Sequence, residues 1–185
     1  MPLVATLNAA RVLDALGGLL GVDHDELGRL ALEASPESLS PVLVPYFEGE
    51  RTPNLPDATA SLTGLTLANT TRPAIARAAI EGMLCGLAAG LDAIRGQGVE
   101  LHRLLLIGGA ARNPAVSAIA AQVFDLPIVV PAPGEYVALG AARQAAAVLD
   151  GAWPDWAGAD EVEVPVDTRP DIRARYAAAA LGFRP

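Results

Sequence analysis

The sequence predicts an α/β fold in which helices flank a layered parallel sheet. The main observation is a run from residue 104 to 149, where an apolar strand, a glycine loop, a helix, a second apolar strand and a second helix follow one another. Such alternation is typical of parallel strands joined by helical crossovers. A second observation is the composition, because 52% of the 185 residues are hydrophobic and only 4% are aromatic. We therefore expect a well-buried core that is rich in small side chains.

The N-terminal part is predicted to hold a short strand and two helices. The strand covers residues 2–7, and a helix follows over 8–20, with Asn8 as a residue type that caps helices and with apolar residues along one face. The Asp-x-x-Glu pattern at residues 23–26 is a variant of the capping box. It predicts a second helix over 24–34.

An extended segment and a loop rich in carboxylates come next. Residues 42–47 are apolar and are predicted to be extended, and the prolines that follow favour an ordered loop. Glu48, Glu50 and Asp57 lie close together in this loop. We expect a solvated loop with an ion pair to Arg51 rather than a catalytic group.

A long helix is predicted from a cap at Thr71 to about Gly96. Its glycines Gly82, Gly86 and Gly90 are four residues apart, so they form a narrow stripe on one face. Such a stripe lets another backbone approach closely, which would suit a helix packed under a site. Chance in a chain full of small residues is an equally good explanation.

The run over residues 104–149, on which the fold prediction depends, has clear strand and helix boundaries. A buried strand over residues 104–107 leads into a tight loop over 108–112, and Asn113 followed by proline is a strong helix start. This helix is predicted to end near residue 124. A second buried strand then covers residues 128–130.

The remaining elements are a helix and a tail. Glu135 precedes a helix that reaches about residue 149. Acidic and apolar residues alternate over 161–166, which indicates an edge strand. Pro170 is predicted to open a last short helix, with Tyr176 facing the body of the protein.

The charged residues exclude several functions. All 13 basic residues are arginine, so the chain contains no lysine. A Walker-type phosphate loop, a pyridoxal enzyme and a protein kinase each require one. The net charge of −8 and the pI of about 4.7 make nonspecific nucleic-acid binding unfavourable.

Cysteine, histidine and hydropathy point to a cytoplasmic protein without a membrane partner. Cys85 is the only cysteine, so no intrachain disulfide and no cysteine metal cluster can form. His24 and His102 lack the spacing of metal ligands. The mean hydropathy is positive, but no run of about 18 uncharged apolar residues occurs. We expect no metal site in this chain.

The glycine loop permits one kind of chemistry. Gly108 and Gly109 stand between a buried strand and a helix start, where a backbone can approach a ligand closely and where negative charge is favoured. A glycine pair alone is more often a plain turn, and the G-x-G-x-x-G pattern of dinucleotide sites is absent. Small residues over 135–142 would leave room beside this loop for a flat ring.

These residues carry a resemblance. Residues 105–113, followed by 135–142, look like the adenosine motif of sugar kinases of the FGGY family. The run over 44–53 and the Gly-Leu-Thr at 64–66 resemble the xylulokinases of that family in particular. The resemblance implies an actin-like ATPase (ribonuclease H-like) fold, of which this chain resembles an incomplete second lobe. Residues 1–150 would form the nucleotide-binding lobe, and residues 151–185 its C-terminal tail.

The resemblance also implies which residues contact the nucleotide. In the glycine loop, they are Gly108, Gly109 and Ala110, where the family often has a third glycine, together with Asn113. On the first helix, Ala10 and Asp14 match positions that line the adenine pocket in relatives. Asn113 can also be a helix cap, and the two roles can coexist. No catalytic residue and no metal ligand is carried over to this chain.

The implied activity is ATP- and Mg²⁺-dependent phosphorylation of D-xylulose by an intact kinase whose other lobe holds the sugar and the catalytic aspartate. The alternatives are a kinase of another sugar or polyol (ribulose, gluconate or glycerol) and a non-catalytic actin-like binding module. The isolated chain is expected to be inactive. Its apolar surface, which would face the absent strands, favours a homo-oligomer.

Overall fold

The computed structural model describes residues 2–34, 40–156, 158 and 160–183. Its α-helices are α1 (Arg11–Leu20), α2 (His24–Glu33), α3 (Arg72–Arg95), α4 (Pro114–Val123), α5 (Tyr136–Asp150) and α6 (Pro170–Ala180). Its strands are β1 (Val42–Val44), β2 (Ser61–Thr63), β3 (Leu104–Leu105), β4 (Ile128–Pro131) and β5 (Glu161–Val164). Two 3-10 helices, η1 (Gly109–Arg112) and η2 (Leu181–Phe183), complete the described elements. The mixture of helices and sheet confirms the predicted fold class.

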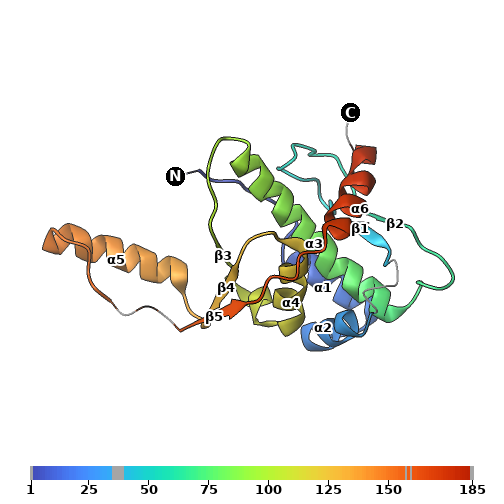
Figure 1. Ribbon diagram of the computed structural model, residues 1–185, viewed down its shortest axis with the longest axis horizontal. Coiled ribbons are helices and arrows are strands. Elements are labelled where there is room, and N and C mark those ends of the chain that lie inside the picture. The colour runs from blue at the N-terminus through green and yellow to red at the C-terminus, as the bar shows by residue number, and fades with distance from the viewer. Residues whose placement is uncertain (1, 35–39, 157, 159, 184–185) are drawn as a thin grey trace.

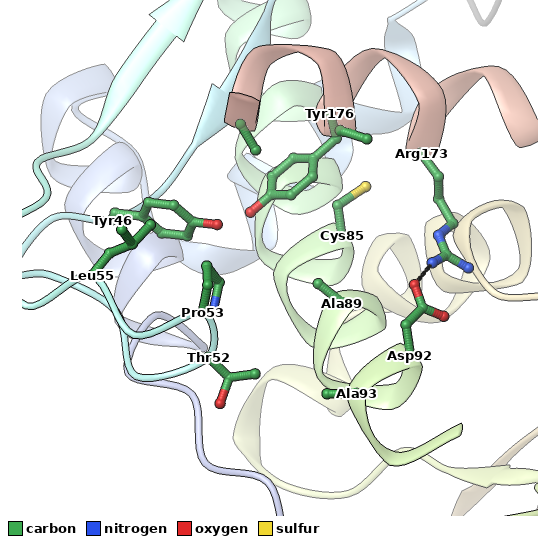
Figure 2. A pocket seen from close by; sticks show the side chains of 12 residues that line it. Tyr46, Thr52, Pro53, Leu55, Cys85, Ala89, Asp92, Ala93, Arg173 and Tyr176 are labelled. Carbon is green, nitrogen blue, oxygen red and sulfur yellow. Dashed lines mark hydrogen bonds and ion pairs between the residues drawn. The ribbon is translucent and has the colours of Figure 1, made fainter. Parts of the chain in front are cut away.

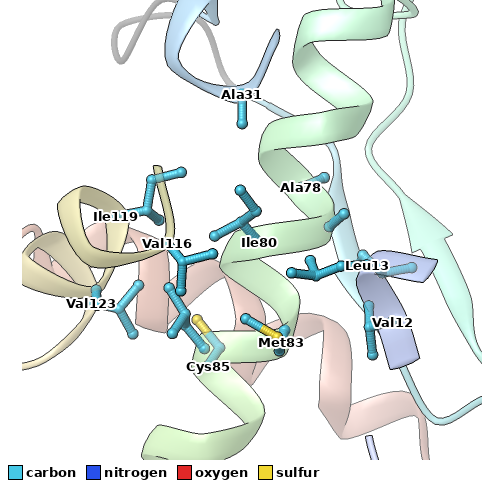
Figure 3. Packing of buried hydrophobic residues seen from close by; sticks show 14 of the residues in the cluster. Val12, Leu13, Ala31, Ala78, Ile80, Met83, Cys85, Val116, Ile119 and Val123 are labelled. Carbon is cyan, nitrogen blue, oxygen red and sulfur yellow. The ribbon is translucent and has the colours of Figure 1, made fainter. Parts of the chain in front are cut away.

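The long helix α3 is the centre of the fold, and α1, α2, α4, α6 and β1 pack around it (Figure 1). Thr71 caps α3 as predicted, because its hydroxyl oxygen accepts a hydrogen bond from the Ala74 amide at 3.3 Å. Figure 3 shows the core on both sides of this helix, where Ile80 meets Val116 and Ile119. These side chains are almost completely buried, so the core consists of medium and small apolar groups, as the composition indicates.

The glycines of the stripe on α3 differ in how closely other segments pack against them. A Cβ added at Gly82 would lie 2.4 Å from the Leu43 carbonyl oxygen, so β1 can lie against α3 only because this residue has no side chain. At Gly86 the nearest atom is the Tyr176 hydroxyl at 3.7 Å, which is an ordinary contact. Close packing therefore explains Gly82, and it does not explain Gly86.

Helix α3 also contains a buried ion pair. The Arg77 Nε donates to Glu81 Oε1 at 2.6 Å, and both side chains are buried. Arg175 of α6 lies 3.8 Å from the other oxygen of Glu81 and also donates to the Ser40 carbonyl. Because Glu81 is shared by two arginines, it ties α6 to the central helix.

The described strands form two small sheets. Strands β1 and β2 pair antiparallel, and the order of the other sheet is β3-β4-β5. In that sheet β3 runs parallel to β4, with Leu104 opposite Ile128, and β5 runs antiparallel to β4. The parallel pair and the edge strand confirm the sequence-based predictions. Strand β2 is too short and too polar to have been recognised.

The segment before α1 differs from the prediction. Residues 2–7 form no strand, and Asn8 is not the cap of α1, whose N-cap is Ala10 without a side-chain hydrogen bond. The Asn8 amide instead donates to the Gly49 carbonyl at 2.8 Å and to Glu50 Oε2 at 3.0 Å. A long-range polar contact thus replaces the expected local one.

Glu50 also corrects the expectation of a solvated loop paired with Arg51. Its carboxylate is buried, with 3% of the residue exposed, and it accepts hydrogen bonds from the backbone amides of Leu7 and Arg51 at 2.8 and 2.7 Å. With the bond from Asn8, these donors satisfy a charge that has no cationic partner in the described part of the chain. Glu48 pairs with Arg11 rather than Arg51.

Helix α5 projects away from the rest of the molecule (Figure 1). None of its residues is buried, although it is the next element after β4. The tail holds it in place, since Arg143 donates to the Trp156 carbonyl at 3.1 Å and its guanidinium lies 6.0 Å from the Trp156 ring centre. At the other end of the tail, Tyr176 of α6 is buried as predicted.

Helix α3 is, among the described helices, the one that is long and apolar enough to cross a membrane by length and composition alone. However, 72% of its most apolar window is buried inside the protein. A core helix passes the same test, and the packing of α3 is that of a core helix.

Candidate functional site

The glycine loop has the geometry that a close backbone approach needs. Strand β3 ends at Leu105, and the chain turns at Gly108, whose φ of 104° is open to glycine alone. Gly109 then starts η1. A Cβ at Gly109 would meet nothing within 4 Å, so this residue borders open space rather than neighbouring protein.

A pocket of about 620 Å³ lies on this loop. One wall is the glycine loop from Leu106 to Arg112, and the opposite wall is the loop over residues 131–136 that follows β4. Asp160 and Val162 close it from the side of β5. The parallel pairing of β3 and β4 explains this arrangement, because the carboxyl ends of parallel strands meet at one edge of a sheet, where ligands bind in open α/β folds.

The charged groups of the pocket are few. Arg112 lines it together with Glu135 and Asp160. The Tyr136 hydroxyl donates to the Ala132 carbonyl and thereby braces the wall opposite the glycines. The pocket therefore combines a glycine backbone, one guanidinium and two carboxylates.

Asn113 caps α4 as predicted and also reaches α2. Its Oδ1 accepts from the Ala115 amide at 2.9 Å, and its Nδ2 donates to the His24 carbonyl at 2.6 Å. This contact depends on Gly28, where an added Cβ would lie 2.3 Å from Asn113 Oδ1. The side chain of Asn113 is thus held between two helices, and it does not line the pocket of the glycine loop.

His24 connects two of the residues that the resemblance implied. Its ring Nε2 lies 2.8 Å from Asp14 Oδ1, and its carbonyl accepts from Asn113. Asp14 and His24 border a second, shallow pocket at the junction of α1 and α2. Ala10 is exposed at the start of α1, and Ala110 is half-buried against the core.

The structure therefore brings Gly108 and Gly109 into one pocket and joins Asp14 to Asn113 through His24. Sequence reasoning missed His24, because no helical spacing relates it to Asp14. It also missed Arg112 and Asp160, which reach the pocket through the loop and through the antiparallel strand. None of the small residues at 138–142 lines the pocket, because α5 turns away from it. Of residues 135–142, only Glu135 and Tyr136 line it, so the expected room beside small side chains is not what the structure shows.

A further pocket, of about 760 Å³, lies between the loop over residues 46–55, α3 and α6 (Figure 2). Arg173 and Asp92, which line it, form an ion pair with each other. Burial raises the pKa of the Cys85 thiol to about 12, so the thiol is protonated at neutral pH and is a poor nucleophile. Burial, and then the neighbouring Tyr46, raise the pKa of Tyr176. Among the described residues that line this pocket, no charged group is left without a partner.

Among the described residues, no three His, Cys, Asp or Glu side chains lie close enough to hold a metal ion. We therefore assign no metal ligand in this part of the chain. What the site can do is bind: it offers backbone amides, a cation and an open cavity at the carboxyl end of a parallel strand pair.

The arrangement is that of the actin-like ATPase fold, which the sugar kinases that the structure matches share. The solved xylulose kinase of Bifidobacterium adolescentis superposes with a TM-score of 0.84 at 45% sequence identity, over 94% of this chain and 35% of that one. Residues 6–149 match the FGGY family of carbohydrate kinases, C-terminal domain. The chain belongs to the FGGY family of carbohydrate kinases.

Relatives within the family differ in their substrates. The xylulose kinase of Haemophilus influenzae is 36% identical over 145 residues, which cover 78% of this chain and 29% of that protein. The glycerol kinase of Delftia acidovorans is 37% identical over 131 residues, which cover 68% of this chain and 26% of that protein. The chain thus spans less than a third of the length of these relatives.

Proposed function

We propose that this chain supplies the adenosine-binding side of the cleft in a kinase that transfers the γ-phosphate of ATP to D-xylulose and forms D-xylulose 5-phosphate. The pocket on the glycine loop is the observation that carries the proposal. It is open, it is walled on one side by glycine backbone, and it lies where two parallel strands end. The xylulose kinases among the relatives support the choice of sugar.

The roles of the residues follow from their positions. Gly108 and Gly109 give the adenosine a wall without side chains. Asn113, Ala10 and Asp14 lie on neighbouring elements, where the chain of contacts through His24 holds α1, α2 and α4 together. We propose that these residues border the adenine. Ala110 packs against the core and would hold the glycine loop in place.

Phosphoryl transfer depends mainly on positioning and on stabilising charge. We propose that Mg²⁺ arrives as its complex with ATP, since no described cluster here could hold it alone. The sugar, and the base that takes the proton of its hydroxyl group, would be held by a lobe outside this chain. The chain alone is expected to show no xylulose-dependent ATP hydrolysis, which a coupled assay measures.

Nucleotide binding is tested by calorimetric titration of ATP into the chain and into Gly109→Asp. The substitution projects a carboxylate into open space without disturbing the packing, and we expect it to weaken binding about tenfold or more. Gly182→Asp is the control, because Gly182 also borders open space but lies on η2, which packs against α6. Equal binding by the two variants, or no binding by the unaltered chain at millimolar ATP, would contradict the proposal.

The glycerol kinases at similar identity favour one alternative, a kinase of another polyol or sugar such as glycerol, ribulose or gluconate. A non-catalytic actin-like binding module is the other. An assay of a kinase that contains this lobe, with each sugar in turn, separates these possibilities. Turnover with glycerol alone would reject xylulose, and turnover with none would favour the module.

The setting and assembly are also proposals. A cytoplasmic location fits a chain whose single cysteine is buried and reduced. Exposed apolar side chains on α5 and along β3, including Val137, Leu149 and Leu105, favour self-association of the isolated chain. Light scattering at high concentration checks this, and a monomer would contradict it.

A further inference from the structure

Arg112 differs from most of the arginines that the structure describes in having a guanidinium without a described partner. Most of the described arginines form an ion pair or donate to a carbonyl, as Arg11, Arg77 and Arg95 do. In the part of the chain that the structure describes, the side chains of Arg51 and Arg112 have no such partner. Arg51 is exposed on a loop and lines no described pocket, whereas Arg112 lines the pocket of the glycine loop.

The charge of Arg112 decides what that pocket can accept. The other ionised groups among its described lining residues are the carboxylates of Glu135 and Asp160. Without a cation these carboxylates would repel a polyphosphate, since like charges at short range raise its free energy. The sequence has no lysine that could supply the missing charge. Arg112 is therefore the place in this pocket where an anion can be neutralised.

The chemistry of the side chain suits a phosphate group. A guanidinium presents several N–H donors in one plane and binds phosphate oxygens in a bidentate manner. A side chain that is already in an ion pair would have to break that pair first, and Arg112 has none to break. Its donors are available at the edge of a cavity whose wall is glycine backbone.

We propose that Arg112 binds the phosphate chain of the nucleotide and so makes the lobe prefer ATP over adenosine. This inference rests on the proposed function, because it assumes that the adenosine lies against Gly108 and Gly109. Arg112 would then neutralise the charge of the phosphate groups, as a lysine does in other phosphate sites, and its planar guanidinium would donate several hydrogen bonds to them.

The test compares ATP with adenosine in calorimetric titrations of the chain, Arg112→Gln and Arg51→Gln. We expect Arg112→Gln to weaken ATP binding about 10- to 100-fold, the range for charge-assisted hydrogen bonds. Adenosine should bind this variant within about twofold of the unaltered chain, and its ATP affinity should depend less on salt. Arg51→Gln, which removes an equally free guanidinium outside the pocket, should change neither affinity.

The outcomes separate the inference from the proposed function. If adenosine binds and Arg112→Gln leaves ATP affinity unchanged, Arg112 does not bind phosphate, but the placement of the adenosine stands. An equal loss of both ligands in Arg112→Gln would mean that the residue only supports the loop, which also overturns the inference. Failure of the unaltered chain to bind either ligand would overturn both. Circular dichroism of each variant shows whether its fold is intact.

Discussion

Helices α3 and α5 have similar compositions and opposite surroundings. Both are rich in alanine, and each has glycine in its interior, three in α3 and one in α5. Most residues in the first half of α3 are buried, and five other elements pack against it, whereas no residue of α5 is buried. The composition of an apolar, alanine-rich helix therefore does not determine whether the helix is buried in the core. Its burial is decided by whether other segments present faces that fit it.

Small residues act differently in the two helices. In α3, Gly82 allows the backbone of β1 to touch the helix, which a side chain would prevent. In α5, a Cβ added at Gly140 would meet nothing within 4 Å, so no contact with the described residues requires a glycine there. The same residue type is a packing requirement in one helix and a cost in helix propensity in the other.

The largest expected contrast comes from truncating a leucine in each helix. Leu84 of α3 is fully buried, while Leu149 of α5 is 85% exposed. Leu84→Ala should lower the free energy of unfolding by about 2–5 kcal/mol, because it removes buried methyl groups and leaves a cavity. Leu149→Ala should change it by less than about 0.5 kcal/mol. Urea denaturation measures both, and equal effects would show that α5 is packed in solution.

A smaller contrast lies within α3 itself. Gly82→Ala should destabilise the protein by about 1–3 kcal/mol, because the new Cβ is forced against the Leu43 carbonyl. Gly86→Ala should stabilise it by up to about 1 kcal/mol, since alanine favours the helix and its Cβ has room. Thermal unfolding of the two variants checks the order. Similar melting temperatures would mean that the stripe does not determine how β1 approaches.

The smallest effect concerns the far end of α3, where Arg95 binds Asp125 at 2.8 Å. This hydrogen bond lowers the pKa of Asp125 below its usual value. The stability it contributes is therefore present above the unfolded pKa, near about 3.9, and is lost as the pH falls through the folded pKa. Because the side chain is half exposed, we expect less than about 1 kcal/mol.

The Asp125 prediction is checked by titrating its carboxyl group by NMR and by urea unfolding at neutral and acidic pH. Arg95→Gln should return the pKa of Asp125 towards its ordinary value and remove this part of the pH dependence. An unchanged titration in the variant would show that the ion pair does not persist in solution.

The sequence patterns predicted those structural features that depend on residues close together in the chain. The caps Asp23, Thr71 and Asn113 act as expected, since each bonds an amide within three residues. Asn8 and Glu50 did not follow their local patterns, because each satisfies the other across more than 40 residues of sequence. No spacing rule reveals such a pair, although a buried carboxylate must find donors somewhere.

The candidate site was predicted on one side only. Gly108 and Gly109 could be recognised because a glycine pair after a buried strand is itself a signal. The opposite wall depends on which strand lies beside β3, and Asp160 reaches the pocket only because β5 pairs with β4. The burial of α5 could not be judged from its composition, which is rich in alanine like that of the buried α3. Residue roles at the nucleotide remain predictions for the titrations to decide.

The exposure of α5 has a thermodynamic consequence for any partner that binds to this helix. A helix of 15 residues that buries none of them is held by its own propensity and by the contact of Arg143 with Trp156, and isolated helices of this length are marginal in water. Its amide hydrogens should thus exchange with solvent far sooner than those of α3. A surface that covered α5 would have to order it first, and part of the binding free energy would be spent on folding the helix.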